Sequence, residues 1–436
     1  MKPDDYILVS VDDHVVEPAN MFEQHLPVQW KSRAPRIVHK KDGTDVWTFE
    51  GAQIPNIGLN AVVGRPPEEY GVEPTSFDQL RPGCYDVHER VRDMNANGVL
   101  ASMCFASYPG FCGQLFARQD DKKLAAAMLR AYNDWHIDTW CGAYPERFIP
   151  LALPPLWDVD LMAEEVRRVA RKGCHSISFT DNPNVLGYPS LHSPHWDPFW
   201  RACCDEEMVV CIHIGSSSGM QFTSPDSPVD VMITVSPMSI VGCAADLLWS
   251  PVLRNFPAIK FALSEGGIGW VPYFLERADY VYQHHHKWTH QDFGGKLPSD
   301  VFREHMITCF IDDAIGVKCR HDVGLDTITW ECDYPHSDTT WPHAPEILAR
   351  SMEGVPDAEV AKITHQNALR HFHFDPFSRR PQEKCTAAAL RAESPDADVA
   401  ERSVRGGKPP NDDPSRPVTS EDIARQLASA LQLPAE

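Results

Sequence analysis

The stretch 148–214 decides the fold, because short apolar runs alternate in it with helical patterns. The runs are FIPLAL (148–153), HSISFT (175–180) and VVCIHI (209–214), and the segments between them, 158–172 and 196–207, have the apolar spacing of amphipathic helices. Strands that alternate with helices form right-handed β-α-β units around a parallel sheet. The stretch therefore predicts an α/β protein.

The same alternation extends in both directions along the chain. The further predicted strands are 6–11, 100–105, 259–264, 307–311 and 327–331, and the further predicted helices are 121–140, 240–253, 271–286 and 345–353, with a short helix after 311. Eight such units favour a closed (β/α)8 barrel over an open, doubly wound sheet. We predict one barrel domain over residues 1–376.

Three segments interrupt this rhythm. Residues 19–97 are rich in Pro and Gly and are predicted to form an inserted cap or lid over one mouth of the barrel. Residues 216–238 form a long loop, and long loops are often functional. Residues 377–436 are polar, charged and Pro-rich, which predicts a disordered tail. Within that tail, residues 419–433 could form a short amphipathic helix that begins with a capping motif.

The composition limits the partners and the compartment. The 436 residues carry a formal net charge of −21, which argues against nucleic acid and anionic membranes and leaves a small molecule as the expected partner. There are 13 cysteines without a CxxC pair, a pattern typical of reduced thiols in a cytoplasmic protein. The sequence contains no run of about 18 apolar residues, so no membrane span is expected. A homo-oligomer is possible, and the composition does not decide this.

The first chemical motif is VDDHVVEP, residues 11–18, at the end of the first predicted strand. Side chains two apart on a strand share a face, so Asp12 and His14 are expected to point together and Asp13 away from them. A carboxylate and an imidazole in this arrangement can hold one divalent metal ion. A polar junction between strand and loop is the alternative interpretation of this motif alone.

Other polar residues end other predicted strands. His213 ends VVCIH, Glu265 stands directly before Gly266 and Gly267, and Asp333 follows the last strand with His336 three residues later. Each of these could be structural by itself. The carboxyl ends of barrel strands, however, are the face where such enzymes build their active sites. The shared position therefore predicts one metal site formed by Asp12, His14, His213, Glu265 and Asp333.

The motifs resemble the amidohydrolase superfamily, in particular the branch around aminocarboxymuconate-semialdehyde decarboxylase. Asp12-Asp13-His14 matches the acidic form of the first-strand motif, His213 matches the metal histidine of the fifth strand, and Cys332-Asp333-Tyr334-Pro335-His336 matches the segment with the last-strand aspartate. Residues 363–372 resemble the terminal helix of that branch. The resemblance covers about residues 6–376 without the first insertion, and it implies a distorted TIM barrel and a catalytic divalent metal ion.

One position departs from the family pattern. Glu265 stands where the family often has the histidine of a His-Gly-Gly-Gly segment, a residue that acts on the attacking water or the substrate. Glu265 could replace that histidine as a general base or bind a second metal ion. The carboxylate-rich ligand set, which Glu17 and His336 could extend, suits one or two ions of zinc, iron or manganese.

The predicted function is metal-dependent hydrolysis or non-oxidative decarboxylation of a small molecule that bears a carboxylate, amide or thioester. Asp333 is expected to be a ligand or the base that accepts a proton from water, with Glu265 and His336 as further catalytic residues. The alternative is a non-heme di-iron monooxygenase that re-uses this barrel, and a third reading is a binding protein without catalysis. His284, His285 and His286 point in different directions on one predicted helix, so at most one or two of them could serve the site.

Overall fold

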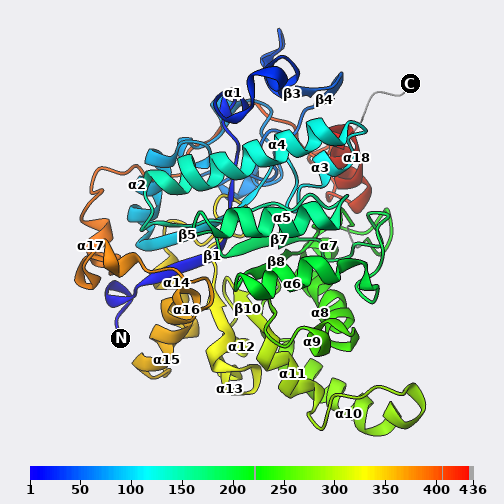
Figure 1. The fold of residues 1–436 in the computed structure, drawn as a ribbon. Helices are drawn as coiled ribbons and strands as arrows, with labels where there is room; N and C mark the ends of the chain where they lie inside the picture. Colours follow the sequence, from blue (N-terminus) through cyan, green and yellow to red (C-terminus); the bar gives the residue numbers. More distant parts are fainter. Residues whose placement is uncertain (220–221, 405, 432–436) are drawn as a thin grey trace.

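Eight apolar runs of the sequence form one parallel sheet in the computed structural model, which describes residues 1–219, 222–404 and 406–431 (Figure 1). The strands are β1 (Leu8–Val15), β5 (Val99–Ala106), β6 (Phe148–Ile149), β7 (Ser176–Phe179), β8 (Val209–His213), β9 (Lys260–Ser264), β10 (Met306–Phe310) and β11 (Ile328–Trp330). Their order in the sheet is β6-β5-β1-β11-β10-β9-β8-β7.

The two edge strands of this sheet meet, and their contact closes the barrel. Strand β6 has only two residues, but Ala152 just beyond it pairs in parallel with Ile177 of β7. The backbone N–H of Ala152 donates to the carbonyl of Ser176 at 3.0 Å, and the N–H of Ser178 donates to the carbonyl of Ala152 at 2.8 Å. The distorted (β/α)8 barrel predicted from the sequence is confirmed.

Helices surround the sheet and cover its outer face. The main ones are α4 (Lys122–Asp134), α5 (Val159–Ala170), α6 (Asp197–Asp205), α8 (Ile240–Trp249), α10 (Val271–Thr289), α11 (Pro298–His305), α14 (Ala344–Ser351) and α16 (Asn367–His371). Helix α5 shows why these segments are helical. The carboxylate of Asp158 caps its first turn, and Met162, Val166 and Val169 bury one face at helical spacing.

The strands bury side chains on both faces, as parallel strands in α/β proteins do. Along β1, Val9 and Val11 belong to an inner core that fills the barrel, whereas Leu8 and Val15 belong to the larger core between strands and helices. Val9 and Val11 therefore point into the barrel. The pairing of β1 with β5 shifts register between Ser10 and Asp13, and beyond this irregularity Asp12 and His14 face the inside of the barrel whereas Asp13 faces away from them.

The first insertion contains helix α1 (Met21–His25) and an antiparallel sheet of β2 (Arg36–His39), β3 (Asp45–Phe49) and β4 (Ala52–Ile54). Its end differs from the prediction, because residues 87–97 form α2 (Val87–Asn97). This helix begins at the capping carboxylate of Asp86, ends at Gly98 with a φ of 71°, and packs beside β5. It is a barrel helix, so the cap ends before it.

The segment after residue 376 also differs from the prediction of a disordered tail. Helix α17 (Ala387–Arg391) packs on α2 and β5, with Cys385, Ala387 and Leu390 buried. The N–H of Ala387 donates to the carbonyl of Tyr6 at 2.8 Å. Two buried residues of this five-residue helix are enough for the contact, although the average composition of the tail is polar. The domain boundary at residue 376 remains a prediction.

The long loop 216–238 contains α7 (Val229–Val235), which the tail reaches. Helix α18 (Ser420–Leu431) corresponds to the predicted helix 419–433, whose last two residues lie outside the described part of the chain. The N–H of Ser420 donates to the carbonyl of Ser227 at 2.8 Å, and that of Val229 donates to the carbonyl of Val418 at 2.9 Å. The tail therefore contacts the loop that follows β8.

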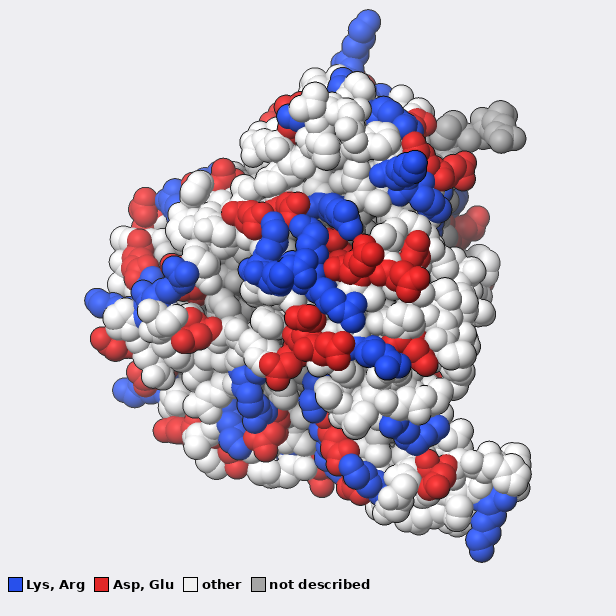
Figure 2. All heavy atoms as spheres, in the orientation of Figure 1, with Lys and Arg blue, Asp and Glu red and all other residues white. Residues whose placement is uncertain are grey.

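Charged side chains of both signs share the face shown in Figure 2. Over α4 and α5, Arg168 pairs with Glu165 and Asp134, and Lys172 pairs with Asp134. Among the described helices, none alone has the length and apolar content for a membrane span; α7 and the segment Pro237–Trp249 reach them only together, with a bend of 47° between them.

Candidate metal centre

Strand β1 carries the first two donors of the site. Asp12 and His14 are both fully buried, and the intervening Asp13 points the other way. There, the carboxylate of Asp13 accepts hydrogen bonds from the hydroxyl of Ser10 at 3.0 Å, from the N–H of Tyr334 at 3.0 Å and from the hydroxyl of Ser102. Burial raises the pKa of Asp13 to about 6. Asp13 thus joins β1 to its neighbours β5 and β11 and fixes the direction of the two donors.

Four predicted donors converge inside the carboxyl end of the barrel. Nε2 of His14 lies 3.2 Å from Nε2 of His213 and 3.3 Å from Oδ1 of Asp333. The carboxylate oxygens of Asp12 lie 3.6 Å from each of the two imidazole Nε2 atoms. The structure therefore brings Asp12, His14, His213 and Asp333 together from β1, β8 and the end of β11.

The carboxylates of this group lack the partners that buried carboxylates need. Neither oxygen of Asp12 accepts a hydrogen bond from any described residue, and Oδ1 of Asp333 has only the ion contacts of His14 and His336. An uncompensated buried charge costs several kcal/mol, so a cation or a proton has to satisfy these oxygens. Burial, together with the charges of Glu331 and Glu265, raises the pKa of Asp12 well above its usual range.

The imidazoles have the form that binds metal. Burial, followed by the neighbouring His336 and His213, lowers the pKa of His14 well below its usual range, so its ring is neutral. Nδ1 of His213 lies 2.6 Å from the carbonyl of Ile214, which assigns the N–H to Nδ1 and the lone pair to Nε2. Two imidazoles and two carboxylates form a donor set that fits a divalent transition-metal ion.

Glu265 also faces this group. Its Oε2 lies 2.9 Å from Nε2 of His213, and its side chain is 18% exposed, whereas the side chains of the four donors are at most 1% exposed. The backbone of Glu265 has a φ of 59°, in the left-handed region that favours glycine. Its N–H donates to Oε2 of Glu331 at 3.1 Å. This position allows Glu265 to act as a ligand or as a base beside the metal.

His336 approaches from the loop after the last strand. Its Nδ1 lies 2.9 Å from Oδ1 of Asp333, and its ring centre is 3.8 Å from the ring centre of His14. Burial lowers the pKa of His336, but the charge of Asp333 outweighs this effect and raises it to about 9. His336 therefore stands at the site as a proton donor next to Asp333.

Glu17 does not belong to the group, contrary to the extended ligand set. Its two carboxylate oxygens accept the backbone N–H groups of Ser107 at 3.0 Å and Tyr108 at 2.8 Å. Glu17 thereby holds the loop after β5, which places Phe111 with its ring centre 4.2 Å from that of His213. The role of Glu17 is to position an aromatic wall of the site.

The glycines after Glu265 are needed because the turn there has no room for side chains. A Cβ at Gly266 would lie 2.6 Å from Cγ2 of Ile240, and one at Gly269 would lie 2.7 Å from Cγ2 of Ile315. The carboxylate of Asp313 accepts the N–H groups of Ile268 at 2.8 Å and Gly269 at 2.6 Å. These glycines are required by packing, and Asp313 fixes the loop from the end of β10.

Two supporting residues, Glu331 and Asp313, were not predicted. Glu331 is buried, and its Oε2 accepts the thiol of Cys309 at 2.6 Å as well as the N–H of Glu265. Burial raises the pKa of Glu331 to about 8. A carboxylate inside the apolar run 327–331, two residues before Asp333, is the signal that could have identified Glu331.

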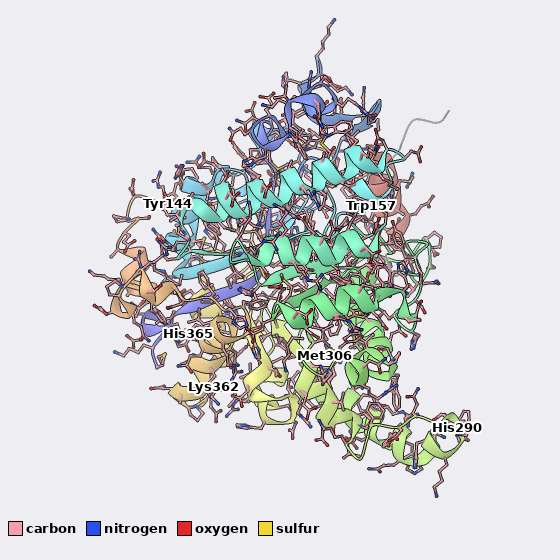
Figure 3. The ribbon with its side chains drawn as sticks, in the orientation of Figure 1. Tyr144, Trp157, His290, Met306, Lys362 and His365 are labelled. Atoms are coloured by element: carbon pink, nitrogen blue, oxygen red, sulfur yellow. The ribbon has the colours of Figure 1, made fainter. Side chains whose placement is uncertain are left out.

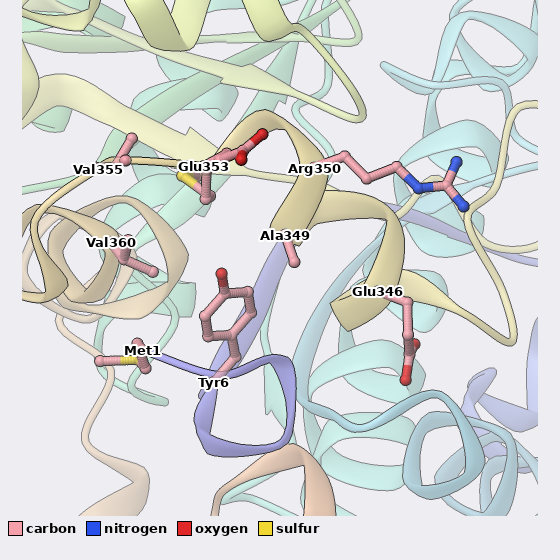
Figure 4. Close-up of a pocket in the computed structure, with 10 residues that line it drawn as sticks. Met1, Tyr6, Glu346, Ala349, Arg350, Glu353, Val355 and Val360 are labelled. Atoms are coloured by element: carbon pink, nitrogen blue, oxygen red, sulfur yellow. The ribbon is translucent and has the colours of Figure 1, made fainter.

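The three consecutive histidines lie elsewhere. Nδ1 of His284 lies 2.8 Å from the carbonyl of Tyr280, and Nδ1 of His286 lies 2.8 Å from that of Tyr282, so both rings bond to their own helix, α10. A cavity of about 320 Å³ is also separate from the site (Figure 4). It is lined by Tyr6 before the start of β1, and in barrels of this type that end contributes stability rather than catalysis.

Comparisons with known proteins agree with this geometry. Residues 39–374 match the family model described as amidohydrolase. The chain is similar to an amidohydrolase from Mycobacterium avium subsp. paratuberculosis, with 17% identity, 84% of this chain and 98% of that chain covered, and a TM-score of 0.63. It is similar to 5-carboxyvanillate decarboxylase from Sphingomonas paucimobilis, with 17% identity, 85% and 100% coverage, and a TM-score of 0.58.

A third similar structure contains a metal ion. It is the 5-carboxyvanillate decarboxylase from Novosphingobium aromaticivorans with bound manganese and a nitrobenzoic acid derivative. This structure has 18% identity to the chain, 84% of this chain and 97% of that chain are covered, and the TM-score is 0.56. At this level of identity the three likenesses show the fold alone.

Proposed function

The chain belongs to the amidohydrolase family and is an enzyme of the hydrolase or lyase type, and from this premise we propose that Asp12, His14, His213 and Asp333 hold its catalytic divalent metal ion. The substrate is a small molecule that bears a carboxylate, amide or thioester. The observation that carries the proposal is the convergence of these four donors in two groups that share His14, namely Asp12 with His14 and His213, and His14 with Asp333 and His336. The carboxylate of Asp12 accepts no hydrogen bond from any described residue. The family match favours hydrolysis or non-oxidative decarboxylation and gives no support to a di-iron monooxygenase.

The metal would polarise a carbonyl or carboxylate oxygen of the substrate and make a bound water more acidic. Manganese is the first ion to test, because it is bound in one of the similar structures and accepts a mixed set of carboxylates and imidazoles. Zinc and iron suit the same donors and are the alternatives.

Residues of the chain would carry the proton. Glu265 reaches the ring of His213 and is the most exposed carboxylate of the group, so it can accept a proton from water during hydrolysis. In a decarboxylation, a carboxyl group there or the His336 imidazolium can donate the proton that replaces carbon dioxide on carbon. Phe105 and Phe111, whose ring centres lie 5.0 Å and 4.2 Å from that of His213, keep bulk water away.

Aromatic carboxylates are the first substrate class to test. Two of the similar structures are decarboxylases of 5-carboxyvanillate, and the walls of the site in this chain are aromatic. Decarboxylation breaks the bond between ring carbon and carboxylate, leaves the electron pair on the ring carbon and adds a proton there. It uses no oxidant, so turnover should not depend on oxygen.

The test is turnover by full-length protein that has been stripped of metal and reloaded with manganese, zinc or ferrous iron. Release of carbon dioxide from hydroxylated benzoates is measured beside hydrolysis of amides and thioesters, with and without oxygen. His213→Ala should be inactive, while His192→Ala, which removes an exposed histidine outside the group, should be active. Strictly oxygen-dependent turnover, or equal turnover by both variants, would contradict the proposal.

A further inference from the structure

Helix α10 extends away from the barrel, and no described part of the chain covers its outer face. It projects beyond the other helices, and His290 just after its last turn lies at the tip of this projection (Figure 1, Figure 3). Its buried residues, Val271, Leu275 and Ala278, all belong to the first half of the helix. No residue of the second half is fully buried, although Tyr282 packs on the buried Phe293.

Large aromatic side chains form a stripe on the exposed face of α10. Tyr273 is 73% exposed, Tyr280 47% and Trp288 69%. At about 100° per residue the three fall within roughly 80° of arc, on the side opposite the buried residues. Among the described residues only two other tyrosine, tryptophan or phenylalanine side chains are exposed, Tyr70 and Phe222. A clustered aromatic surface of this kind is typical of an interface.

The charges beside the stripe indicate what covers it. Glu276 and Lys287 are exposed and have no ion partner among the described residues. They are eleven residues apart, so they lie about 16 Å apart along the axis and about 20° apart around it. When two copies of α10 lie antiparallel across a two-fold axis, Glu276 comes opposite Lys287 of the partner subunit, and the pair occurs twice. The surface is complementary to itself.

We propose that α10 pairs with α10 of a second copy of this chain in an antiparallel dimer. A two-fold interface uses the same patch on both subunits, as this stripe does. The projecting half of each helix would then lie over the first half of the other. There, Trp288 of the partner subunit would meet Tyr273.

The size of the stripe suits a reversible dimer. Nineteen residues of helix span about 28 Å. Three aromatic side chains can bury about 150–250 Å² each, and a specific interface of standard size buries about 800 Å² on each partner. The three side chains are already partly buried, so the stripe supplies part of this area and the other exposed side chains of α10 supply the rest. A dimer that forms at micromolar concentration is expected.

The experiment measures the mass of the full-length chain in solution over a range of protein concentrations by sedimentation. Glu276→Lys and Lys287→Glu each oppose like charges twice, so each should raise the dissociation constant about tenfold or more. The double variant restores opposite charges and should return to the wild-type value within about threefold. This rescue separates a lost interface from a lost fold. Lys41→Glu, on the cap, is the matched control and should have no effect.

Three outcomes would overturn the proposal. The first is a wild-type monomer at high micromolar concentration. The second is a dimer that both single variants leave unchanged, because the interface then lies elsewhere. The third is a double variant that remains as weak as the single ones, because the two positions then do not face each other.

Discussion

The Nε2 atoms of His14 and His213 lie 3.2 Å apart, although their strands, β1 and β8, stand across the barrel from each other with three strands between them. The N–H of His213 is assigned to Nδ1 by the carbonyl of Ile214, so its Nε2 offers a lone pair. A lone pair does not attract the nitrogen of a second neutral ring unless that ring carries the intervening proton. A shared metal ion explains why both rings point to one position.

His213→Ala removes one neutral ligand from this position. We expect metal affinity to fall by well over tenfold, since changes that merely touch ligand support already cost 10- to about 100-fold. The measurement is the metal-to-chain ratio after dialysis against a weak chelator, with His192→Ala as the control. Full occupancy in His213→Ala would show that the ion binds elsewhere.

Glu265→Gln tests the departure from the family pattern. If Glu265 is the base, the variant keeps its metal content and its kcat falls by about 10²- to 10⁴-fold. If Glu265 binds a second ion, the content falls from about two ions per chain to about one. We expect the first result, because Asp12, His14, His213 and Asp333 already complete one site. An unchanged rate and metal content in Glu265→Ala would make Glu265 a structural turn residue.

Glu331 makes the stability of the metal-free chain depend on pH. Its pKa is raised in the fold from 4.5 to about 8, so the folded state favours the protonated form. The related stability is fully present below pH 4.5 and is lost as the pH rises toward 8. Glu331→Gln keeps an oxygen that can accept the N–H of Glu265 and cannot ionise.

We therefore expect the wild-type chain to lose roughly 1–3 kcal/mol more than Glu331→Gln in free energy of unfolding between pH 5 and pH 8. Urea unfolding of protein freed of metal by a chelator measures this difference. Parallel pH profiles for the two proteins would mean that Glu331 ionises in the fold as easily as in solution.

Truncation tests the docked part of the tail. A chain that ends at Arg380 loses α17, and the surfaces that cover Ala387 and Leu390 become exposed. We expect a loss of about 2–4 kcal/mol in free energy of unfolding, as for removal of a large buried side chain. A chain that ends at residue 400 retains these contacts and is the control. Equal stability of the two truncated chains would restore the prediction of a disordered tail.

The barrel strands and the four convergent donors could be predicted because each depends on a local signal. An apolar run such as 209–214 is a strand wherever it lies, and the polar residue at its end must appear at the carboxyl face. Contacts between segments that are distant in the sequence have no such local signal. Glu17 was assigned to the extended ligand set because nothing near it in sequence shows that the N–H groups of Ser107 and Tyr108, some 90 residues later, satisfy its carboxylate.

The prediction for the tail was wrong for a related reason. Composition averaged over residues 377–436 conceals the few apolar side chains that α17 buries, and burial of Leu390 depends on the barrel surface that receives it. The glycines after Glu265 are a similar case, because the residues that require them, Ile240 and Ile315, belong to other elements.

The near-complete burial of Asp12, His14, His213 and Asp333 has a kinetic consequence. A chelator cannot reach donors that are at most 1% exposed unless the surrounding loops first separate. A bound ion would thus leave no faster than that opening, however high the concentration of the chelator. The metal content of the purified protein would then depend more on the ions present while the chain folded than on those in the buffer afterwards.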